Sequence, residues 1–530
     1  MIWVPGRRAA PFLALAAGAL AAIAHPPFGV LPGLLGYALL LHLVDQTEGP
    51  RPLRQAFWRG WLAAFAYFAI GCWWVAEAFL VDAEGQGWMA PIAVTLIPAG
   101  LGLFWGTACA LYRWLRPRGA FRVLAFAGFL AALEWLRGHV LSGFPWNLPG
   151  ETWVAGSPPS QTAALVGAYG LTWITLAVAA AFAIPFGGHR RGQSVAAVGG
   201  ALVVLAGLYG FGWHRLEGAP ATPPGQPLIR VAQANVEQEK KYDEAHFRSI
   251  VERYARLTAQ PAGRTPDIVV WPEGAIPDSA NAVLAPESWT REAIEAALKP
   301  GQTLMMGAYR IEAGAEKPRY YNTFLTLRRE RGGMMLTSHY DKHHLVPFGE
   351  FLPMEPVLEA VGLKRVSRVG EGFTPGPPSA PLKPLGVPAF QPLICYEALF
   401  PGLVRRAVNN AAVRPTWMVN VSNDAWFGAT SGPWQHLNLA SYRAIENGLP
   451  MVRATPTGVS AVVDAFGRSP LDRRLGLGAM GVVDAPLPPA LKNTTYRRHG
   501  ELFFGLFLAI SAFTAVWEAV RRRYTSTPLP

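Results

Sequence analysis

Three residues with reactive side chains follow apolar segments in the second half of the chain. Glu273 lies in Val-Val-Trp-Pro-Glu-Gly, Lys342 in Tyr-Asp-Lys-His-His, and Cys395 in Gln-Pro-Leu-Ile-Cys-Tyr-Glu. The segments before them have the β-branched and aromatic composition of strands, and strand ends are where sites form in α/β folds. A thiolate at neutral pH needs a nearby base or cation. Glu273 could supply the base and Lys342 the cation, provided that the fold brings three distant positions together.

Each residue also has an ordinary explanation. A carboxylate in a turn faces solvent, most lysines are surface charges, and an isolated cysteine is often a buried core thiol. The other two cysteines, Cys72 and Cys109, fall inside long apolar segments, so the polar part of the chain cannot form an internal disulfide. Three nearby histidines lack the helix and the glutamate of a zinc motif, so no metal site is predicted: His339, His343 and His344.

The composition predicts a membrane protein. The 530 residues are 51% hydrophobic and only 15% charged, against about 25% in soluble domains. Apolar stretches recur along the chain, several near the length of about 20 residues that a bilayer requires. We expect a bundle of about eight membrane-spanning helices, at 9–24, 29–43, 60–81, 88–112, 121–141, 161–186, 195–213 and 502–520.

The arginines between these stretches predict the orientation. Of 15 arginines near the spans, 14 fall on one side, and only Arg137 falls on the other. The positive-inside rule makes the arginine-rich side cytoplasmic. Both termini then lie in the cytoplasm, and the long segment before the last span lies in the periplasm. The net charge of +12 therefore suits a membrane surface, and no polar Lys/Arg run indicates nucleic-acid binding.

The start of the chain has a second interpretation. Arg7-Arg8, an apolar run and Ala22-Ile23-Ala24 are similar to a signal peptide with its cleavage site. Cleavage would remove the first span and leave the orientation of the others unchanged.

The long segment between the seventh and eighth expected spans has the sequence pattern of an α/β domain. Alternating strand-like and helix-like segments from Leu228 onward predict a layered fold. The expected organisation is seven spans in 1–213, a Pro- and Gly-rich linker at 214–227, a catalytic domain at 228–490, an eighth span at 500–521 and a cytoplasmic tail at 522–530.

The motifs around the three reactive residues resemble those of the nitrilase (carbon–nitrogen hydrolase) superfamily in order and spacing. They are Trp271-Pro-Glu, Asp341-Lys342 with Pro-Phe-Gly-Glu350, Ile394-Cys-Tyr-Glu397, and Asn420-Val-Ser-Asn-Asp-Ala-Trp-Phe-Gly428. With the flanking spans and Gly143-Phe-Pro-Trp146, almost the whole chain resembles the apolipoprotein N-acyltransferase family, the membrane-bound branch of that superfamily. The resemblance implies an α-β-β-α sandwich inserted into a helical bundle in a bacterial inner membrane.

The resemblance also implies roles for individual residues. Glu273, Lys342 and Cys395 would form the catalytic set, with Glu350, Tyr396 and Glu397 in support. Glu350 and Glu397 would orient Lys342 or serve as structural ion pairs. Phe348, Trp426 and Phe427 are candidates for an apolar rim that contacts the substrates, although ordinary core packing would explain them equally well. The last candidate is Tyr242, an aromatic residue placed by a loose alignment.

The implied reaction moves a fatty acyl chain, without a cofactor. A phospholipid would acylate Cys395 as a thioester, and the α-amino group of a diacylglyceryl-modified apolipoprotein would accept the chain. Two rival functions use the same residues differently: a membrane-tethered amidase with water as second nucleophile, and a lipid or lipoprotein carrier with an inactive site. The spans carry few central charges of the kind that mark ion pathways, which disfavours a transporter.

Overall fold

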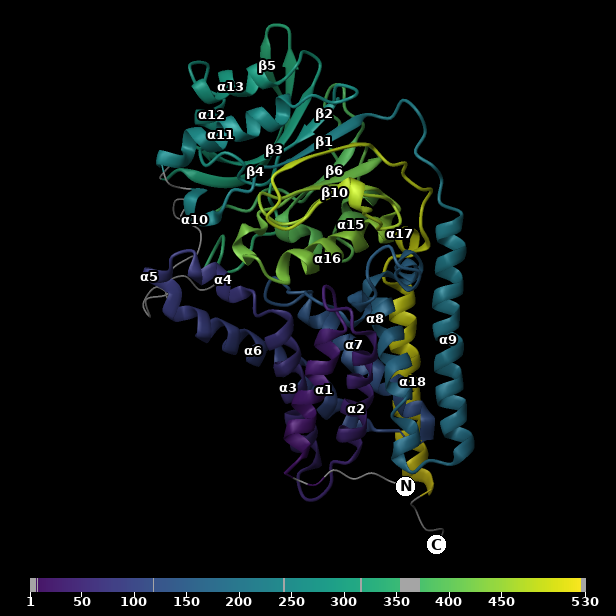
Figure 1. Cartoon of the computed structure of the whole chain (residues 1–530). Coiled ribbons are helices and arrows are strands. Elements are labelled where there is room, and N and C mark those ends of the chain that lie inside the picture. The colour runs from purple at the N-terminus through teal and green to yellow at the C-terminus, as the bar shows by residue number, and fades with distance from the viewer. Residues whose placement is uncertain are drawn as a thin grey trace. The chain divides into compact units, whose positions relative to one another are not determined.

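The computed structural model describes residues 6, 8–117, 119–241, 244–314, 317–352 and 372–525. Internal contacts divide the chain into two compact units, and each is described here by itself (Figure 1). The helical unit comprises Met1–Ala76, Met89–Gly218 and Asn493–Pro530, and the second unit comprises Glu77–Trp88 and Ala219–Lys492.

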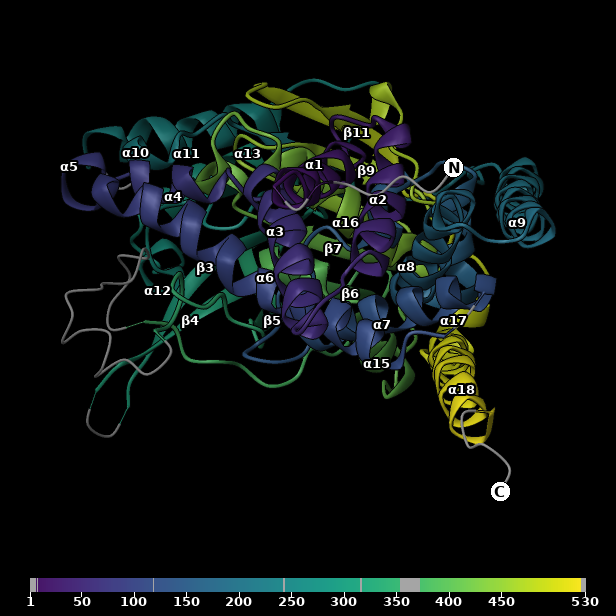
Figure 2. The same ribbon diagram turned by 90° about the horizontal axis from the view of Figure 1, so that it is seen from below.

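The helical unit consists of helices, all of them apolar except the short α17. They are α1 (Ala10–Ile23), α2 (Leu35–Asp45), α3 (Pro52–Gly71), α6 (Ala90–Leu115), α7 (Arg122–Arg137), α8 (Ala163–Ala181), α9 (Arg191–Glu217), α17 (Thr495–His499) and α18 (Leu502–Thr525). In the view from below, α1 and α9 are seen nearly along their axes, so these two helices run in similar directions (Figure 2). Each of the eight apolar stretches expected from the sequence overlaps one of the long helices.

Four helical stretches of the described chain are long and apolar enough to cross a membrane. They are Ala83–Leu115, Gly119–Arg137, Pro159–Ala181 and Arg191–Glu217. Shorter apolar helices occur at Ala10–Ile23, Leu31–Asp45 and Leu502–Trp517. By composition and length the unit is therefore that of a membrane protein.

Small residues allow the helices of this unit to approach closely. A Cβ atom at Gly60 of α3 would lie 2.6 Å from the carbonyl oxygen of Trp105 and 2.7 Å from the sulfur of Cys109, both in α6. Gly18 of α1 similarly meets the backbone of Ala63. Such small-residue contacts are the usual means of packing helices where lipid removes the hydrophobic driving force between them.

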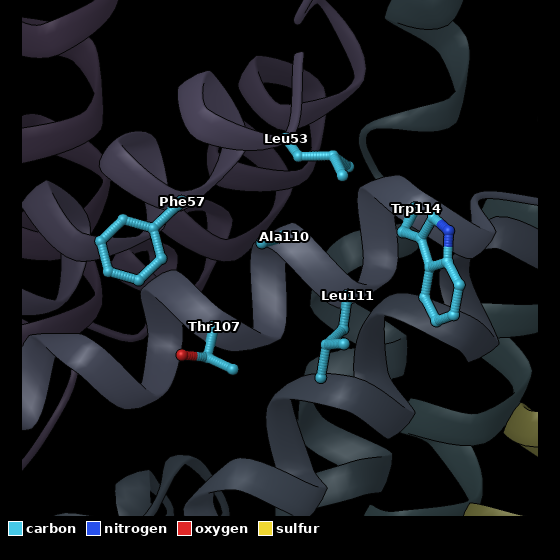
Figure 3. Close-up of a pocket in the computed structure, with 6 residues that line it drawn as sticks. All are labelled: Leu53, Phe57, Thr107, Ala110, Leu111 and Trp114. Atoms are coloured by element: carbon cyan, nitrogen blue, oxygen red, sulfur yellow. The ribbon is translucent and has the colours of Figure 1, made fainter. Parts of the chain in front are cut away.

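An open, mostly apolar pocket lies between α3 and α6 (Figure 3). Its lining residues are Leu53, Phe57, Thr107, Ala110, Leu111 and Trp114. None of them is a candidate site residue, and no ionisable side chain lines the pocket. The reactive residues have to be sought in the second unit.

Two β-sheets organise the second unit. The six-stranded sheet has the order β11-β1-β2-β3-β4-β5 and the five-stranded sheet β10-β9-β8-β7-β6. The strands are β1 (Leu228–Gln233), β2 (Ile268–Val270), β3 (Thr303–Glu312), β4 (Arg319–Glu330), β5 (Gly333–Asp341), β6 (Phe390–Ile394), β7 (Trp417–Val421), β8 (Met451–Ala454), β9 (Ser460–Val463), β10 (Arg474–Leu475) and β11 (Gly481–Pro486). Pairing is parallel along β1-β2-β3 and β6-β7-β8.

Helices cover the outer face of each sheet (Figure 1). Those on the six-stranded sheet are α11 (Glu244–Ala259), α12 (Ala280–Val283) and α13 (Trp289–Ala297), and those on the other are α15 (Leu403–Asn409) and α16 (Gly432–Asn447). Three further short helices occur in the described part of the unit: α4 (Val75–Leu80), whose first two residues belong to the helical unit, α5 (Ala83–Gln86) and α10 (Gln238–Lys241).

Strand alternation explains why this sandwich forms. In β2, Ile268 and Val270 point into the core between the sheets, whereas Val269 points into the core under α11 and α13. Successive strand residues face opposite sides of a sheet, and a strand buried on both sides is apolar throughout. The unit thus has four layers in the order helix, sheet, sheet, helix.

The structure corrects several boundaries. α3 begins at Pro52, not near residue 60, and takes Arg54 and Arg59 into the helix. Long arginine side chains can leave an apolar helix and reach polar groups, as Arg59 does by donating to the carbonyl of Leu43. α9 continues to Glu217, which shortens the expected linker. The sequence also gave no indication of strand β8, which carries the buried Arg453.

Candidate active site

Glu273 is held in a sharp turn directly after β2. The carbonyl of Pro272 accepts a hydrogen bond from the Gly307 amide at 3.2 Å, and Gly274 adopts φ +57°. A Cβ atom at Gly307 would lie 2.6 Å from the Cα of Glu273, so β3 needs a glycine to let this turn approach. Asn322 donates to Oε1 of Glu273 at 2.6 Å. Oε2 is buried and has no hydrogen-bond partner within the described ranges, so it is available to receive a proton.

Lys342 follows β5 immediately and is almost completely buried. Its amide donates to the carbonyl of Asn322 at 2.8 Å. Its Nζ lies 2.9 Å from Oε2 of Glu350 and 3.9 Å from Oε1 of Glu273. Burial alone would lower the pKa of Lys342, but the charges of Glu350 and Glu273 raise it above its ordinary value. The side chain is therefore a fixed ammonium.

Cys395 occupies a strained elbow at the end of β6. It has φ +49°, a left-handed conformation that is uncommon for a residue with a Cβ atom. The residue is partly exposed. Burial of the thiol, reinforced by Glu273, raises its pKa to about 12, against the opposing influence of Lys342. The resting sulfur is therefore a thiol at neutral pH and requires a base to become nucleophilic.

The fold thus brings the three predicted residues into one electrostatic environment. Strands β2 and β5 of one sheet carry Glu273 and Lys342, and β6 of the other sheet carries Cys395. The charges of Glu273 and Lys342 both act on the Cys395 thiol. The sequence motifs identify the residue types, and the packing of the two sheets against each other brings these residues close together.

Glu350 binds the Lys342 ammonium, a contact that fits both an orienting role and a structural ion pair. Its Oε2 also accepts from the Val346 amide at 2.8 Å, and its Oε1 accepts from Asn322 at 2.7 Å. Asn322 therefore bridges the carboxylates of Glu350 and Glu273. Sequence reasoning missed Asn322, because an asparagine inside strand β4 follows no recognisable motif.

Glu397 makes its hydrogen bonds to a tyrosine hydroxyl and to backbone amides of two segments. Its carboxylate accepts four hydrogen bonds, from the Tyr340 hydroxyl at 2.6 Å and from the amides of His343, His344 and Ile394 at 3.1, 3.2 and 2.8 Å. His343 adjoins Lys342, and Ile394 adjoins Cys395. Glu397 ties the two backbone segments together, whereas the ion pairs of Lys342 are with Glu350 and, at a longer distance, with Glu273.

Replacing Glu397 by alanine should destabilise the protein by about 3 kcal/mol or more, because several buried donors lose their acceptor at once. Thermal unfolding of the purified full chain measures this effect. Glu330→Gln is the control, since the Glu330 side chain is 46% exposed and pairs with Arg328. Equal melting temperatures for Glu397→Ala and the control would contradict the role given to Glu397.

Of the other candidate residues, one packs against a neighbouring ring and three are at least partly exposed. The Tyr396 ring packs on Phe400, with centroids 5.0 Å apart. Phe348 is 50% exposed and has φ +62°. Trp426 and Phe427 are partly exposed, and Tyr242 lies outside the described residues.

A second buried lysine was not predicted. Lys241, at the end of α10, is 5% exposed, and its Nζ would lie 2.5 Å from a Cβ atom at Gly274. Burial lowers the pKa of Lys241 to about 8, although Glu273 opposes this shift. In the sequence it stands beside Lys240 and has the appearance of a solvated charge.

Comparisons with known proteins agree with the two-unit architecture. Residues 17–181 match the family model of the apolipoprotein N-acyltransferase N-terminal domain, and residues 228–490 match that of carbon-nitrogen hydrolase. Three similar proteins are each named apolipoprotein N-acyltransferase. The protein from Caulobacter vibrioides is 56% identical, with 94% of this chain and 93% of the relative covered. The protein from Rhodopseudomonas palustris is 38% identical (94% and 93%), and that from Brucella melitensis is 39% identical (90% and 89%). By sequence and by domain composition, the chain belongs to the apolipoprotein N-acyltransferase family.

Proposed function

We propose that this enzyme transfers a fatty acyl chain from a phospholipid to the α-amino group of a diacylglyceryl-modified apolipoprotein through a thioester on Cys395. The observation that carries the proposal is the arrangement around the thiol. A carboxylate oxygen of Glu273 is free to take a proton, and the charges of Glu273 and Lys342 both act on Cys395. These are a base, a cation and a nucleophile, which together suffice for acyl transfer.

In the first half-reaction, Glu273 takes the thiol proton and the sulfur attacks the ester carbonyl carbon of the phospholipid. The C–S bond forms as the carbonyl becomes a tetrahedral oxyanion. The Lys342 ammonium and the amide that follows Cys395 stabilise this charge. The oxyanion then collapses, the bond to the glycerol oxygen breaks, and Glu273 returns the proton to that oxygen. The products are a lysophospholipid and the acylated cysteine.

In the second half-reaction, the neutral α-amine of the apolipoprotein attacks the thioester carbonyl. Glu273 removes a proton from the nitrogen, the C–S bond breaks, and the proton passes to the departing sulfur. An amide forms and the thiol is restored. The two substrates use the same groups in turn, which predicts ping-pong kinetics.

We further propose that eight helices span the membrane, with both termini in the cytoplasm and the catalytic unit in the periplasm of a bacterial inner membrane. The distribution of arginines in the sequence supports this orientation. A membrane location suits the substrates, because moving each CH₂ of an acyl chain from lipid to water costs about 0.8 kcal/mol. Phe348, Trp426 and Phe427 are partly or half exposed and are proposed as an apolar rim for these chains.

The amidase and the acyltransferase differ only in the second nucleophile. Water would release a free fatty acid or other acid, whereas an amine captures the chain. The names of the full-length relatives favour the transferase.

Intact mass spectrometry after incubation with phosphatidylethanolamine tests the proposal. We expect one fatty acyl mass added to the wild-type chain, removable by hydroxylamine and absent in Cys395→Ala. Adding a diacylglyceryl-cysteine peptide should move that mass to the peptide amine. Turnover without an adduct on Cys395 would refute the thioester, and free fatty acid as the only product would favour the amidase.

A further inference from the structure

A buried polar network lies behind Cys395 and has no part in the mechanism above. Ser422 and Asp424 follow strand β7 and are both almost fully buried. The Ser422 hydroxyl donates to Oδ1 of Asp424 at 2.8 Å. Arg453 of β8 donates to both oxygens of Asp424, at 2.8 and 2.7 Å, and His436 of α16 places its Nδ1 3.0 Å from Oδ1. Asp424 is therefore held in place by one residue of β8 and one of α16.

The network reaches the reactive sulfur and its backbone. Strands β6 and β7 pair in parallel with Ile394 beside Val421, so Cys395 and Ser422 are neighbours at the two strand ends. The Ser422 hydroxyl lowers the pKa of the Cys395 thiol, and the backbone of Cys395 interacts with the imidazole of His436. Among the described residues, the charged groups that act on the thiol include Glu273, Lys342 and Asp424. Asp424 therefore influences Cys395 both directly, as a negative charge, and through Ser422.

Asp424 and the Cys395 sulfur compete for the single hydroxyl proton of Ser422. A hydroxyl has a single O–H and can donate to only one acceptor at a time. While it donates to Asp424, it offers the sulfur only a lone pair, which can accept from a thiol but cannot stabilise a thiolate. Burial would raise the pKa of Asp424, but Arg453 and His436 hold that pKa well below its usual range, so the carboxylate remains a strong acceptor.

We propose that Ser422 is a second direct partner of the Cys395 sulfur and that Asp424 sets the direction of its hydroxyl, toward the carboxylate in the resting thiol and toward sulfur in the thiolate. When Glu273 removes the thiol proton, the O–H rotates from Asp424 to sulfur. No further proton leaves the site. Asp424, His436 and Arg453 act as positioning residues, and the network keeps the nucleophile protonated until Glu273 acts.

This inference rests on the proposed function only in taking Cys395 as the nucleophile, and it is tested on the thiol itself. The measurement is the rate at which iodoacetamide alkylates Cys395 at pH 8, followed by peptide mass spectrometry of the full-length protein without substrates. Because this pH lies below the pKa of the thiol, the rate follows the small thiolate fraction.

Two substitutions should change this rate in opposite directions. Ser422→Ala removes the donor to the thiolate and should slow alkylation about fivefold, since a hydrogen bond to a charged group is worth one to two pKa units and a more basic thiolate recovers part of the loss. Asp424→Asn removes a negative charge and the competing acceptor and should accelerate alkylation about fivefold. A general loosening of the site would move both rates in the same direction.

Matched controls separate the proposal from altered packing. Ser422→Thr keeps the hydroxyl and should restore a rate near that of the wild type. Ser441→Ala removes another buried hydroxyl, which among the described residues bonds only to the Leu437 carbonyl, at 2.7 Å, and should leave the rate unchanged. A wild-type rate in folded Ser422→Ala, or slower alkylation in Asp424→Asn, would overturn the proposal. Either variant alone decides the matter if the other fails to fold, and a failure of acyl transfer would leave these rates unaffected.

Discussion

Glu273→Gln should lower acyl transfer about a thousandfold and at the same time make Cys395 easier to alkylate. The loss follows from general base catalysis, which typically contributes 10²–10⁴ in rate. The amide of glutamine cannot take the thiol proton or deprotonate the incoming amine. Its oxygen can still accept the hydrogen bond from Asn322 that the carboxylate accepts now, so the turn should keep its shape.

The gain in alkylation follows from the charge. Glu273 is second only to burial in raising the pKa of the Cys395 thiol, so its neutralisation lowers that pKa and increases the thiolate fraction at any pH below it. Turnover of phospholipid and iodoacetamide modification of the same preparation measure the two effects. If both fell together, loss of structure would explain the variant. If transfer persisted at the wild-type rate, Glu273 would not be the base.

Lys342→Met should reduce transfer about 10²–10³-fold and should also destabilise the protein by about 3–5 kcal/mol. The first figure is the usual result of removing one donor to an oxyanion. The second is the usual result of breaking a buried ion pair by removing one partner. Here the carboxylate left behind is Glu350, which is buried and holds the ammonium at 2.9 Å.

A double substitution separates these two effects. In Lys342→Met/Glu350→Gln the uncompensated charge is gone, so most of the lost stability should return, because paired residues are strongly non-additive. Transfer should remain as low as in Lys342→Met. Thermal unfolding and turnover are measured for the wild type, the two single variants and the double variant, which together form a double-mutant cycle. Recovery of activity along with stability would mean that Lys342 serves the fold alone.

The sequence predicted the strand-end residues well because each stands in a compact motif. Glu273, Lys342 and Cys395 follow apolar segments whose periodicity and flanking residues mark them as strands. The alternation predicted from Leu228 onward is also observed, since β1 begins at Leu228 and α11 lies between β1 and β2 in the sequence.

The residues that sequence reasoning missed act through contacts between elements. Asn322 lies in the middle of a strand and bridges two carboxylates that are 77 positions apart in the sequence. Arg453 is a charged residue in a four-residue strand, and its presence is explained by two buried partners, the carboxylate of Asp424 and the side-chain oxygen of Asn420. Local patterns predict strand or helix, but they do not carry information about which distant side chain satisfies a buried charge.

The left-handed backbone conformation of Cys395 implies a conflict between folding stability and catalysis. Glycine would occupy φ +49° without strain, whereas a residue with a Cβ atom there costs about 1 kcal/mol or more. A lineage released from the need to acylate lipoproteins would therefore gain robustness by exchanging this cysteine for glycine. Keeping a cysteine in this conformation lowers the stability of the folded protein, and natural selection tolerates that loss only while the acyl transfer is in use.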